Sequence, residues 1–313
     1  MDGTRLTGTA LSISLLAACG GGSGSGGGGS GSLTLAVTDG AVDGVDQVVV
    51  EFTGVTLKPR GGTAFDVVFD APLPIDLKSL NSGNSELLLD AETVPAGQYE
   101  WIRLNVNANF DDVLDSYVVE EGGGQVELRV PGGDNSGLKL VSGFAVVAGG
   151  EASFVIDWNL RQGLVEAPGQ QGYKLQPALR ITDMQEYGTI AGTVATGLVT
   201  AEGCTSDPNT GEGNTVYVFE GAGITPDDID GTDPEPLATA EVRLDIGSGN
   251  YEYTAAFLAP GAYTVAFTCH AADDQVPDSE NPGPDVDDPI VFTAGIDATV
   301  TDGNTTPVNF EQI

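Results

Sequence analysis

The chain has 313 residues, enough for two domains at roughly 100–200 residues each, and its 46 acidic and 11 basic side chains give a formal net charge of −35 at pH 7. This charge excludes nucleic acid as a partner, because phosphate binding needs clustered Lys and Arg, and it disfavours direct docking on an anionic membrane surface. One His (His270) and three Cys are too few for a His/Cys zinc cluster or a haem site.

The first eighteen residues are typical of an export signal. Arg5 precedes an apolar run, residues 6–18, that is too short to span a bilayer and ends in small residues. Its end, Leu16-Ala17-Ala18-Cys19, resembles the lipobox of bacterial lipoproteins. The resemblance implies a signal peptide at 1–18, acylation of Cys19 by palmitate-like chains, and an anchor in the lipid bilayer. Gly20 after the Cys favours, by the same resemblance, the outer membrane, on its periplasmic or external face. An ordinary cleaved signal with a coincidental Cys is the alternative.

Residues 20–32 are Gly and Ser only. Such a run is a disordered, flexible coil with an end-to-end distance of about 20 Å. It provides no side chains for chemistry, so residues 19–32 are expected to be a lipidated Cys followed by a spacer.

The stretch 47–57 predicts a strand with a β-bulge. Its apolar face holds Val48, Val50 and Phe52 before Gly54, and Val55 and Leu57 after it. A one-residue shift of the apolar phase at a Gly is what a bulge produces.

The rest of the first half also favours strands, because alternating or β-branched runs are separated by turns rich in Gly, Asp or Pro. These runs are 101–107, 125–130, 138–147, 153–160 (with Phe154, Ile156, Trp158 and Leu160 on one face) and 173–182. The best candidate for a short helix or ordered loop is 77–89.

A second set of strands begins near Gly188. The segments are 188–194, 215–219, 251–257 (Tyr251, Tyr253, Ala255 and Phe257 on one face) and 263–269 (Tyr263, Val265, Phe267 and Cys269). The turn Ala259-Pro260-Gly261 has an echo at Pro95-Ala96-Gly97, and in both a Tyr follows two residues later. The expected fold class is all-β, with two β-sandwich-like domains in series at 33–187 and 188–313.

Residues 33–183 resemble a bacterial family known only as a domain of unknown function, number 4382. The resemblance rests on the segments 35–39, 45–57, 94–104, 137–140, 154–161 and 173–180. It implies architecture and an envelope location but no chemistry. Residues 188–313 are similar to the transthyretin-like (carboxypeptidase-regulatory-like) sandwiches, which usually act as supports or binding modules.

Cys204 and Cys269 are expected to form a disulfide. Both would enter an oxidising compartment, and Cys19 is otherwise engaged. A bridge closing this loop would stabilise the fold by about 4 kcal/mol in the chain-entropy model. The alternative is a reactive thiol pair, which normally has close spacing and basic neighbours.

A catalytic reading of His270 is disfavoured. It adjoins Cys269 and precedes Asp273 and Asp274, yet strand alternation turns it away from the face that buries Cys269. No Gly-x-Ser-x-Gly elbow occurs in the folded part, and a turn explains the segment 133–137 fully.

Two acidic loops, 226–236 and 273–288, raise the possibility of calcium, which takes six to eight oxygens. The candidates are Asp228, Asp230 and Asp233, but the loop fails the EF-hand pattern at positions 1 and 12. Solvated acidic loops are the alternative reading. The acid excess and only four Lys suggest a halophile, because salt screens the self-repulsion of the chain.

Asp157, Arg161 and Arg180 are candidates for a polar site; the alternative is that each Arg pairs with a carboxylate for structural reasons. Together these features predict a non-catalytic cell-envelope lipoprotein that binds or supports, with an envelope protein or polysaccharide as partner. The alternatives are a calcium-dependent adhesin, a glycan-binding lipoprotein, and a glycan-active hydrolase that uses paired carboxylates.

Overall fold

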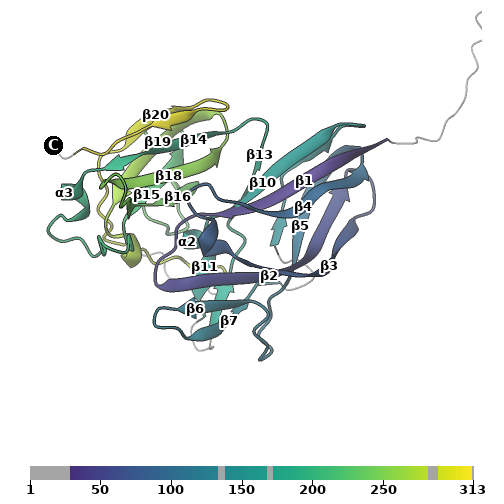
Figure 1. Cartoon of the computed structure of the whole chain (residues 1–313), viewed down its shortest axis with the longest axis horizontal. Helices are drawn as coiled ribbons and strands as arrows, with labels where there is room; N and C mark the ends of the chain where they lie inside the picture. Colours follow the sequence, from purple (N-terminus) through teal and green to yellow (C-terminus); the bar gives the residue numbers. More distant parts are fainter. Residues whose placement is uncertain (1–28, 133–137, 168–171, 281–287, 312–313) are drawn as a thin grey trace, which may run out of the picture.

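The computed structural model describes residues 29–132, 138–167, 172–280 and 288–311. Strands dominate these residues, and they form four sheets, so the expected all-β class is confirmed. Two sheets use strands from residues 30–183 and two use strands from residues 188–307. Figure 1 shows the two halves side by side, with the purple-to-teal strands of the first half beside the green and yellow strands of the second.

The first half contains a four-stranded and a nine-stranded sheet. The smaller has the order β13-β10-β1-β4, with β1 Ser30–Asp39, β4 Glu86–Pro95, β10 Glu151–Trp158 and β13 Leu179–Asp183. The larger has the order β11-β12-β7-β6-β2-β5-β8, with β3 paired to β2 and β9 paired to β5. Its strands are β2 Val45–Pro59, β3 Phe65–Asp76, β5 Gly97–Asn107, β6 Tyr117–Glu120, β7 Gln125–Arg129, β8 Leu138–Leu140, β9 Phe144–Val146, β11 Leu164–Glu166 and β12 Gly172–Leu175.

The core of the first half lies between these two sheets. Leu33, Leu35 and Val37 of β1 belong to the same buried cluster as Val48, Val50, Phe52, Val55 and Leu57 of β2. The predicted bulge is confirmed, because the pairing of β2 with both β3 and β5 shifts register between Phe52 and Gly54. The shift keeps the apolar side chains on both sides of Gly54 directed into the core.

The second half contains two four-stranded sheets. One has the order β17-β18-β14-β21, with β14 Gly188–Val194, β17 Arg243–Leu244, β18 Tyr251–Leu258 and β21 Thr305–Pro307. The other has the order β16-β15-β19-β20, with β15 Thr215–Glu220, β16 Ala238–Glu241, β19 Gly261–Thr268 and β20 Ile296–Val300. Ile190, Val216, Val218 and Phe267 share one buried cluster, so this core also lies between two sheets.

The repeated Pro-Gly turns have a matching structure. Tyr99 follows the turn between β4 and β5, and its hydroxyl donates to the carbonyl of Pro95 at 2.7 Å. Tyr263 follows the turn between β18 and β19, and its hydroxyl donates to the carbonyl of Ala259 at 2.8 Å. Each Tyr therefore closes its own turn through a carbonyl four residues upstream.

Several predicted elements are shorter than expected. The segment 77–89 is helical only over η1, the 3₁₀ turn Leu77–Leu80, and continues into β4. The run 138–147 forms the two short strands β8 and β9, and the run 173–182 is interrupted at 176–178 between β12 and β13. Pro177 lies in that gap, where its missing N–H cannot continue a strand ladder. The strand at 153–160 ends at Trp158, and Leu160 opens the short helix α2, Leu160–Gly163.

The predicted position of Phe257 is wrong. Tyr251, Tyr253 and Ala255 face the core of the second half, but Phe257 packs against Val155 and Tyr187 at the junction of the two halves. A register shift in the β14–β18 pairing and a left-handed φ of 54° at Phe257 turn its side chain to the opposite face. The bulge gives Leu258 the core position instead.

Two short helical segments complete the described elements, α3 (Thr196–Val199) and η2 (Ala271–Asp273). In the described part of the chain, no helix is long and apolar enough to cross a membrane. The domain boundary at 187/188 stays a prediction.

Candidate functional site

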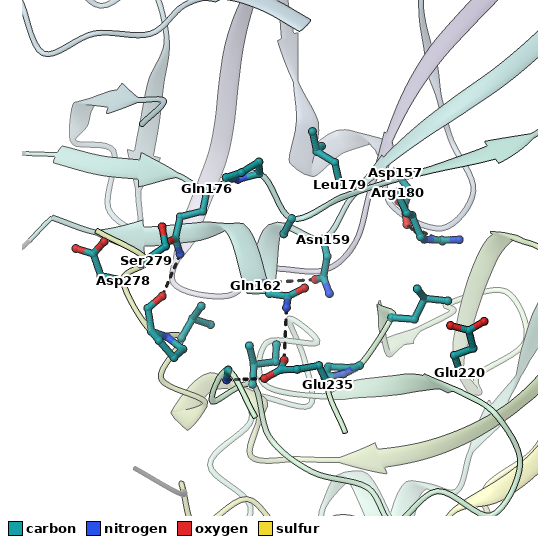
Figure 2. Close-up of a pocket in the computed structure, with 18 residues that line it drawn as sticks. Asp157, Asn159, Gln162, Gln176, Leu179, Arg180, Glu220, Glu235, Asp278 and Ser279 are labelled. Atoms are coloured by element: carbon teal, nitrogen blue, oxygen red, sulfur yellow. Dashed lines mark hydrogen bonds and ion pairs between the residues drawn. The ribbon is translucent and has the colours of Figure 1, made fainter. Parts of the chain in front are cut away.

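A cleft of about 720 Å³ lies where the two halves meet. The first half contributes the end of β10, α2, the 176–178 connection and the start of β13. The second half contributes the connection between β15 and β16 and the segment 276–279 that follows η2. Figure 2 shows these walls facing each other, with Asn159 and Gln162 opposite Glu235.

One edge of the cleft is closed by charged contacts between the halves. Lys174 is buried and its Nζ lies 2.7 Å from Asp278 and 3.2 Å from Glu280. Arg129 also pairs with Glu280. The side chain of Gln176 adds two hydrogen bonds, donating to the carbonyl of Pro277 and accepting from the amide of Ser279. These contacts tie the 276–280 segment to the first half.

A buried arginine holds the halves together behind the cleft. Arg161 is 5% exposed, and its Nη2 lies 2.5 Å from the Oδ2 of Asp43. Its Nη1 donates to the carbonyl of Ala271 and its Nη2 also donates to the hydroxyl of Thr215. Burial, the largest effect, lowers the pKa of Arg161, but the Asp43 carboxylate together with Tyr217 and Asp274 more than offsets it, so the pKa of the guanidinium is raised.

The predicted polar site of Asp157, Arg161 and Arg180 is therefore divided. Arg180 pairs with Asp157 at 2.6 Å, and it also donates to the backbone carbonyls of Ala256 and Phe257 in the second half. Arg161 binds Asp43 instead, because the chain leaves β10 and turns into α2 before residue 161. Asp157 and Arg180 line the cleft, but the Arg180 guanidinium is already engaged by the Asp157 carboxylate and the two backbone carbonyls. Their geometry is that of a structural pair.

The side chains that face the open cleft are different ones. Glu235 accepts hydrogen bonds from the amide of Gly231 at 2.5 Å and from the Gln162 side chain at 3.4 Å. Burial raises the pKa of Glu235 to about 7, and the nearby charges of Asp230 and Asp274 add to this effect. Sequence reasoning missed Glu235, although it lies inside the acidic loop 226–236 that the composition singled out.

Asn159 is the second such side chain. It is 4% exposed, and its Oδ1 accepts from the amide of Gln162 and from the hydroxyl of Thr239. Its Nδ2 is buried and has no hydrogen-bond acceptor among the described residues. A buried donor without an acceptor costs free energy, roughly 1–3 kcal/mol, so this amide is suited to a ligand that supplies one.

A second buried acid lies behind the cleft. Asp39 is 6% exposed; its Oδ1 accepts from the amide of Leu160, and its Oδ2 has no described partner. Burial, followed by the charge of Asp157, raises the pKa of Asp39 well above its usual range. Asp39 is therefore a buried carboxyl whose neutral form is favoured by its surroundings.

The two acidic loops do meet, but through a different set of residues than predicted. Asp228 joins Asp274 and Asp288, and one carboxylate oxygen of each lies within 4.8 Å of the others. Asp230 and Asp233 are not part of this cluster; Asp230 accepts from the amide of Thr232 within its own loop. The clustered carboxylates also accept hydrogen bonds, from the amides of Ile229, Gln275 and Asp288 and from the hydroxyl of Tyr217. These hydrogen bonds are sufficient to explain why the three carboxylates lie together, because they connect the two loops. Calcium binding stays a prediction.

The disulfide prediction is confirmed, because Cys204 and Cys269 are joined. Cys269 therefore has no free thiol to act beside His270. His270 lies 3.9 Å from Asp273 and is outside the cleft. The signal peptide, Cys19 and the segment 133–137 lie outside the described residues.

Comparison with known proteins gives a family match in the first half. Residues 30–177 match the family model described as Domain of unknown function (DUF4382). This match confirms the resemblance noted for the first half, and the transthyretin-like type of the second half stays a prediction. No curated protein matches the chain.

Solved structures with some similarity are surface and adhesion proteins. GBS52, the minor pilin of Streptococcus agalactiae, is 12% identical, with 90% of this chain and 95% of that chain covered and a TM-score of 0.19. A fimbrial protein from Bacteroides ovatus is 8% identical, with 90% and 48% covered and a TM-score of 0.19. A protein from Parabacteroides distasonis, provisionally assigned to cell adhesion, is 12% identical, with 68% and 51% covered and a TM-score of 0.21. Scores this low carry no argument about fold or function.

Proposed function

We propose that this chain is a non-catalytic lipoprotein of the bacterial cell envelope that binds a partner in the cleft between its two halves. In this proposal acylated Cys19 anchors the chain, and the Gly/Ser run holds the folded part clear of the headgroups. The cleft then binds part of another envelope molecule.

The cleft is the observation that supports this proposal. Its volume of about 720 Å³ falls within the range of ligand sites, and its walls come from both halves of the chain. The contacts of Arg161, Lys174 and Gln176 hold the two walls together before any ligand arrives. A cleft that is already formed loses little conformational entropy on binding, which favours recognition of a partner.

The chemistry of the cleft favours binding over catalysis. The residues that line it include no His, Cys or Lys, and its one Arg is engaged by Asp157 and two backbone carbonyls. Cys269, the only Cys beside the His, is oxidised in the disulfide. The described lining residues therefore include neither a Cys or Lys nucleophile nor a His base, which are common parts of covalent catalytic sites.

Photo-crosslinking in living cells tests the proposal. Leu237 lines the cleft, and a photoreactive amino acid placed there is expected to give a discrete crosslinked product. The same amino acid at Val68, which is 74% exposed on β3, serves as the control and should give none. Equal crosslinking at both positions, or none at either, would contradict a binding role for the cleft.

The anchor is tested separately. In cells given an alkyne-labelled fatty acid, the full chain is expected to take up label and to fractionate with the membrane. Cys19→Ala should lose both properties, because the thiol is the acylation site. A Cys19→Ala chain that keeps the label would exclude the lipoprotein assignment.

A further inference from the structure

Two carboxylates in the cleft have no cationic partner. The cleft is lined by four acidic side chains, Asp157, Glu220, Glu235 and Asp278, and by a single basic one, Arg180. Arg180 compensates Asp157 and Lys174 compensates Asp278. Glu220 and Glu235 form no ion pair among the described residues, so the cleft presents uncompensated negative charge from Glu220 and, above its pKa of about 7, from Glu235.

The cleft also offers one unused hydrogen-bond donor. Asn159 Nδ2 is buried and has no acceptor, and Figure 2 shows the Asn159 side chain directed toward the wall that holds Glu235. Gln162 lies between them, donating its backbone amide to Asn159 and its side-chain amide to Glu235. A ligand that reaches both ends must therefore carry a positive charge and a hydrogen-bond acceptor.

Between these polar ends the walls are apolar. Leu179 of the first half faces the cleft, as do Ile229, Leu237 and Val276 of the second half. Such walls suit the methylene stem of a long basic side chain, which packs against apolar surface while its charged head meets a polar group. A saccharide lacks the cation, and a simple polyamine lacks the acceptor.

We propose that the cleft binds a basic side chain of a peptide segment, with its ammonium or guanidinium group on Glu235 and a carbonyl of the same segment on Asn159 Nδ2. This inference rests on the proposed function and names the chemistry of the partner. The net charge of −35 supports it, because an acidic protein attracts basic partners and raises their rate of association.

Two small probes test the assignment on the full chain carrying Cys19→Ala. N-acetyl-lysine amide supplies the ammonium, the stem and the carbonyls, whereas N-acetyl-norleucine amide has the same stem and carbonyls without the charge. In calorimetric or NMR titrations the lysine probe should bind about tenfold more tightly, the gain expected for a charge-assisted hydrogen bond. Its affinity should fall as salt is added.

Variants assign the binding to the cleft. Glu235→Gln keeps the shape of the side chain and should remove most of the preference for lysine over norleucine. Glu151→Gln removes the same charge from the exposed start of β10, away from the cleft, and should leave the preference unchanged. Asn159→Ala should weaken both probes by a similar factor, because it removes the donor to the carbonyl.

The proposal is overturned if the two probes bind equally, if neither binds at millimolar concentration, or if Glu235→Gln and Glu151→Gln behave alike. Maltose and putrescine are titrated in parallel, and preferential binding of either would also overturn it. None of these outcomes depends on the photo-crosslink at position 237, which tests the proposed function separately. If the lysine probe binds but no crosslink forms at position 237 in cells, the result counts against an envelope partner and not against the site for a basic side chain.

Discussion

Arg161 and Asp43 form an ion pair that is almost completely buried, with side chains 5% and 10% exposed. Asp43 lies just after β1 in the first half, and its second oxygen accepts from the amide of Gly213 in the second half. Arg161 contacts Ala271 and Thr215 there as well. The pair is therefore the centre of a polar interface that fixes one half of the chain against the other.

Removing Arg161 alone should be costly. Arg161→Met leaves Asp43 buried without its counter-charge, and such a loss destabilises a protein by about 3–5 kcal/mol. The free energy of unfolding, measured by denaturant titration, should fall by this order. Arg60→Met is the control, because Arg60 is exposed and should change stability by less than about 0.5 kcal/mol.

The partner variant checks the cause. Asp43→Asn combined with Arg161→Met removes both charges and keeps an oxygen for the amide of Gly213, so it should recover part of the loss. A double variant that is less stable than Arg161→Met would show that the buried charge of Asp43 is not the source of the destabilisation.

The disulfide should stabilise the second half. It closes a loop of 65 residues between Cys204 and Cys269, which corresponds to about 4 kcal/mol in the chain-entropy model. The double variant Cys204→Ala/Cys269→Ala should lower the melting temperature, and a thiol reductant should lower that of the wild type but not of the variant. A reductant-sensitive variant would contradict this assignment.

Glu235 should make stability depend on pH. Its folded pKa of about 7 lies above the ordinary value of 4.5, so the folded state holds the proton more tightly than the unfolded state. The stabilisation is complete below pH 4.5 and is lost as the pH rises through 7. Because the side chain is only partly buried, we expect a loss of about 1–2 kcal/mol over this range.

Denaturant titrations at pH 5 and pH 8 measure this effect. Glu235→Gln should reduce the difference in the free energy of unfolding between the two pH values, whereas Glu151→Gln should not. Asp39 and Asp274, whose pKa values are also raised by burial, leave a dependence of the same sign in the Glu235→Gln variant. An unchanged difference in Glu235→Gln would show that Glu235 does not titrate in this range.

The bulge at Gly54 gives a further prediction. A Cβ at this position would lie 2.5 Å from the carbonyl oxygen of Val67 on the neighbouring strand β3. Gly54→Ala should therefore lower the free energy of unfolding by about 1–3 kcal/mol, as overpacking does. Gly124→Ala is the matched control, since its Cβ would approach only the flexible end of Glu120. Equal stability of the two variants would contradict a tight contact at Gly54.

Local patterns were enough to predict many of the strands and the bulge, although β3 was not foreseen and β4 overlaps the segment 77–89 expected to be a short helix or ordered loop. Alternation and the Gly54 phase shift are properties of neighbouring residues, and so is the Tyr that follows each Pro-Gly turn. The disulfide could be predicted because the sequence has only three Cys and Cys19 was assigned to acylation. Phe257 was misplaced because its direction depends on a left-handed φ that no local signal marks.

The cleft could not be predicted in the same way. Asn159, Gln162 and Glu235 are more than seventy residues apart at their extremes, and they meet only because the two halves pack together. Arg161 and Arg180 were recognised as polar candidates, but Arg161 pairs with Asp43 in the connection after β1, and Arg180 also binds the carbonyl of Phe257 in the other half. Composition identified the acidic loops; the packing of the halves selected which acids face the cleft.

The calcium hypothesis makes the last prediction, on the cluster of Asp228, Asp274 and Asp288. Three carboxylates held this close repel one another, and a bound divalent cation would relieve the repulsion. On this hypothesis, the melting temperature of the full chain rises when calcium replaces a chelator in the buffer, and Asp274→Asn removes the rise. Asp233→Asn, outside the cluster, should retain it. Equal melting temperatures with calcium and with chelator would leave the hydrogen bonds to Ile229, Gln275 and Tyr217 as the sole role of these acids.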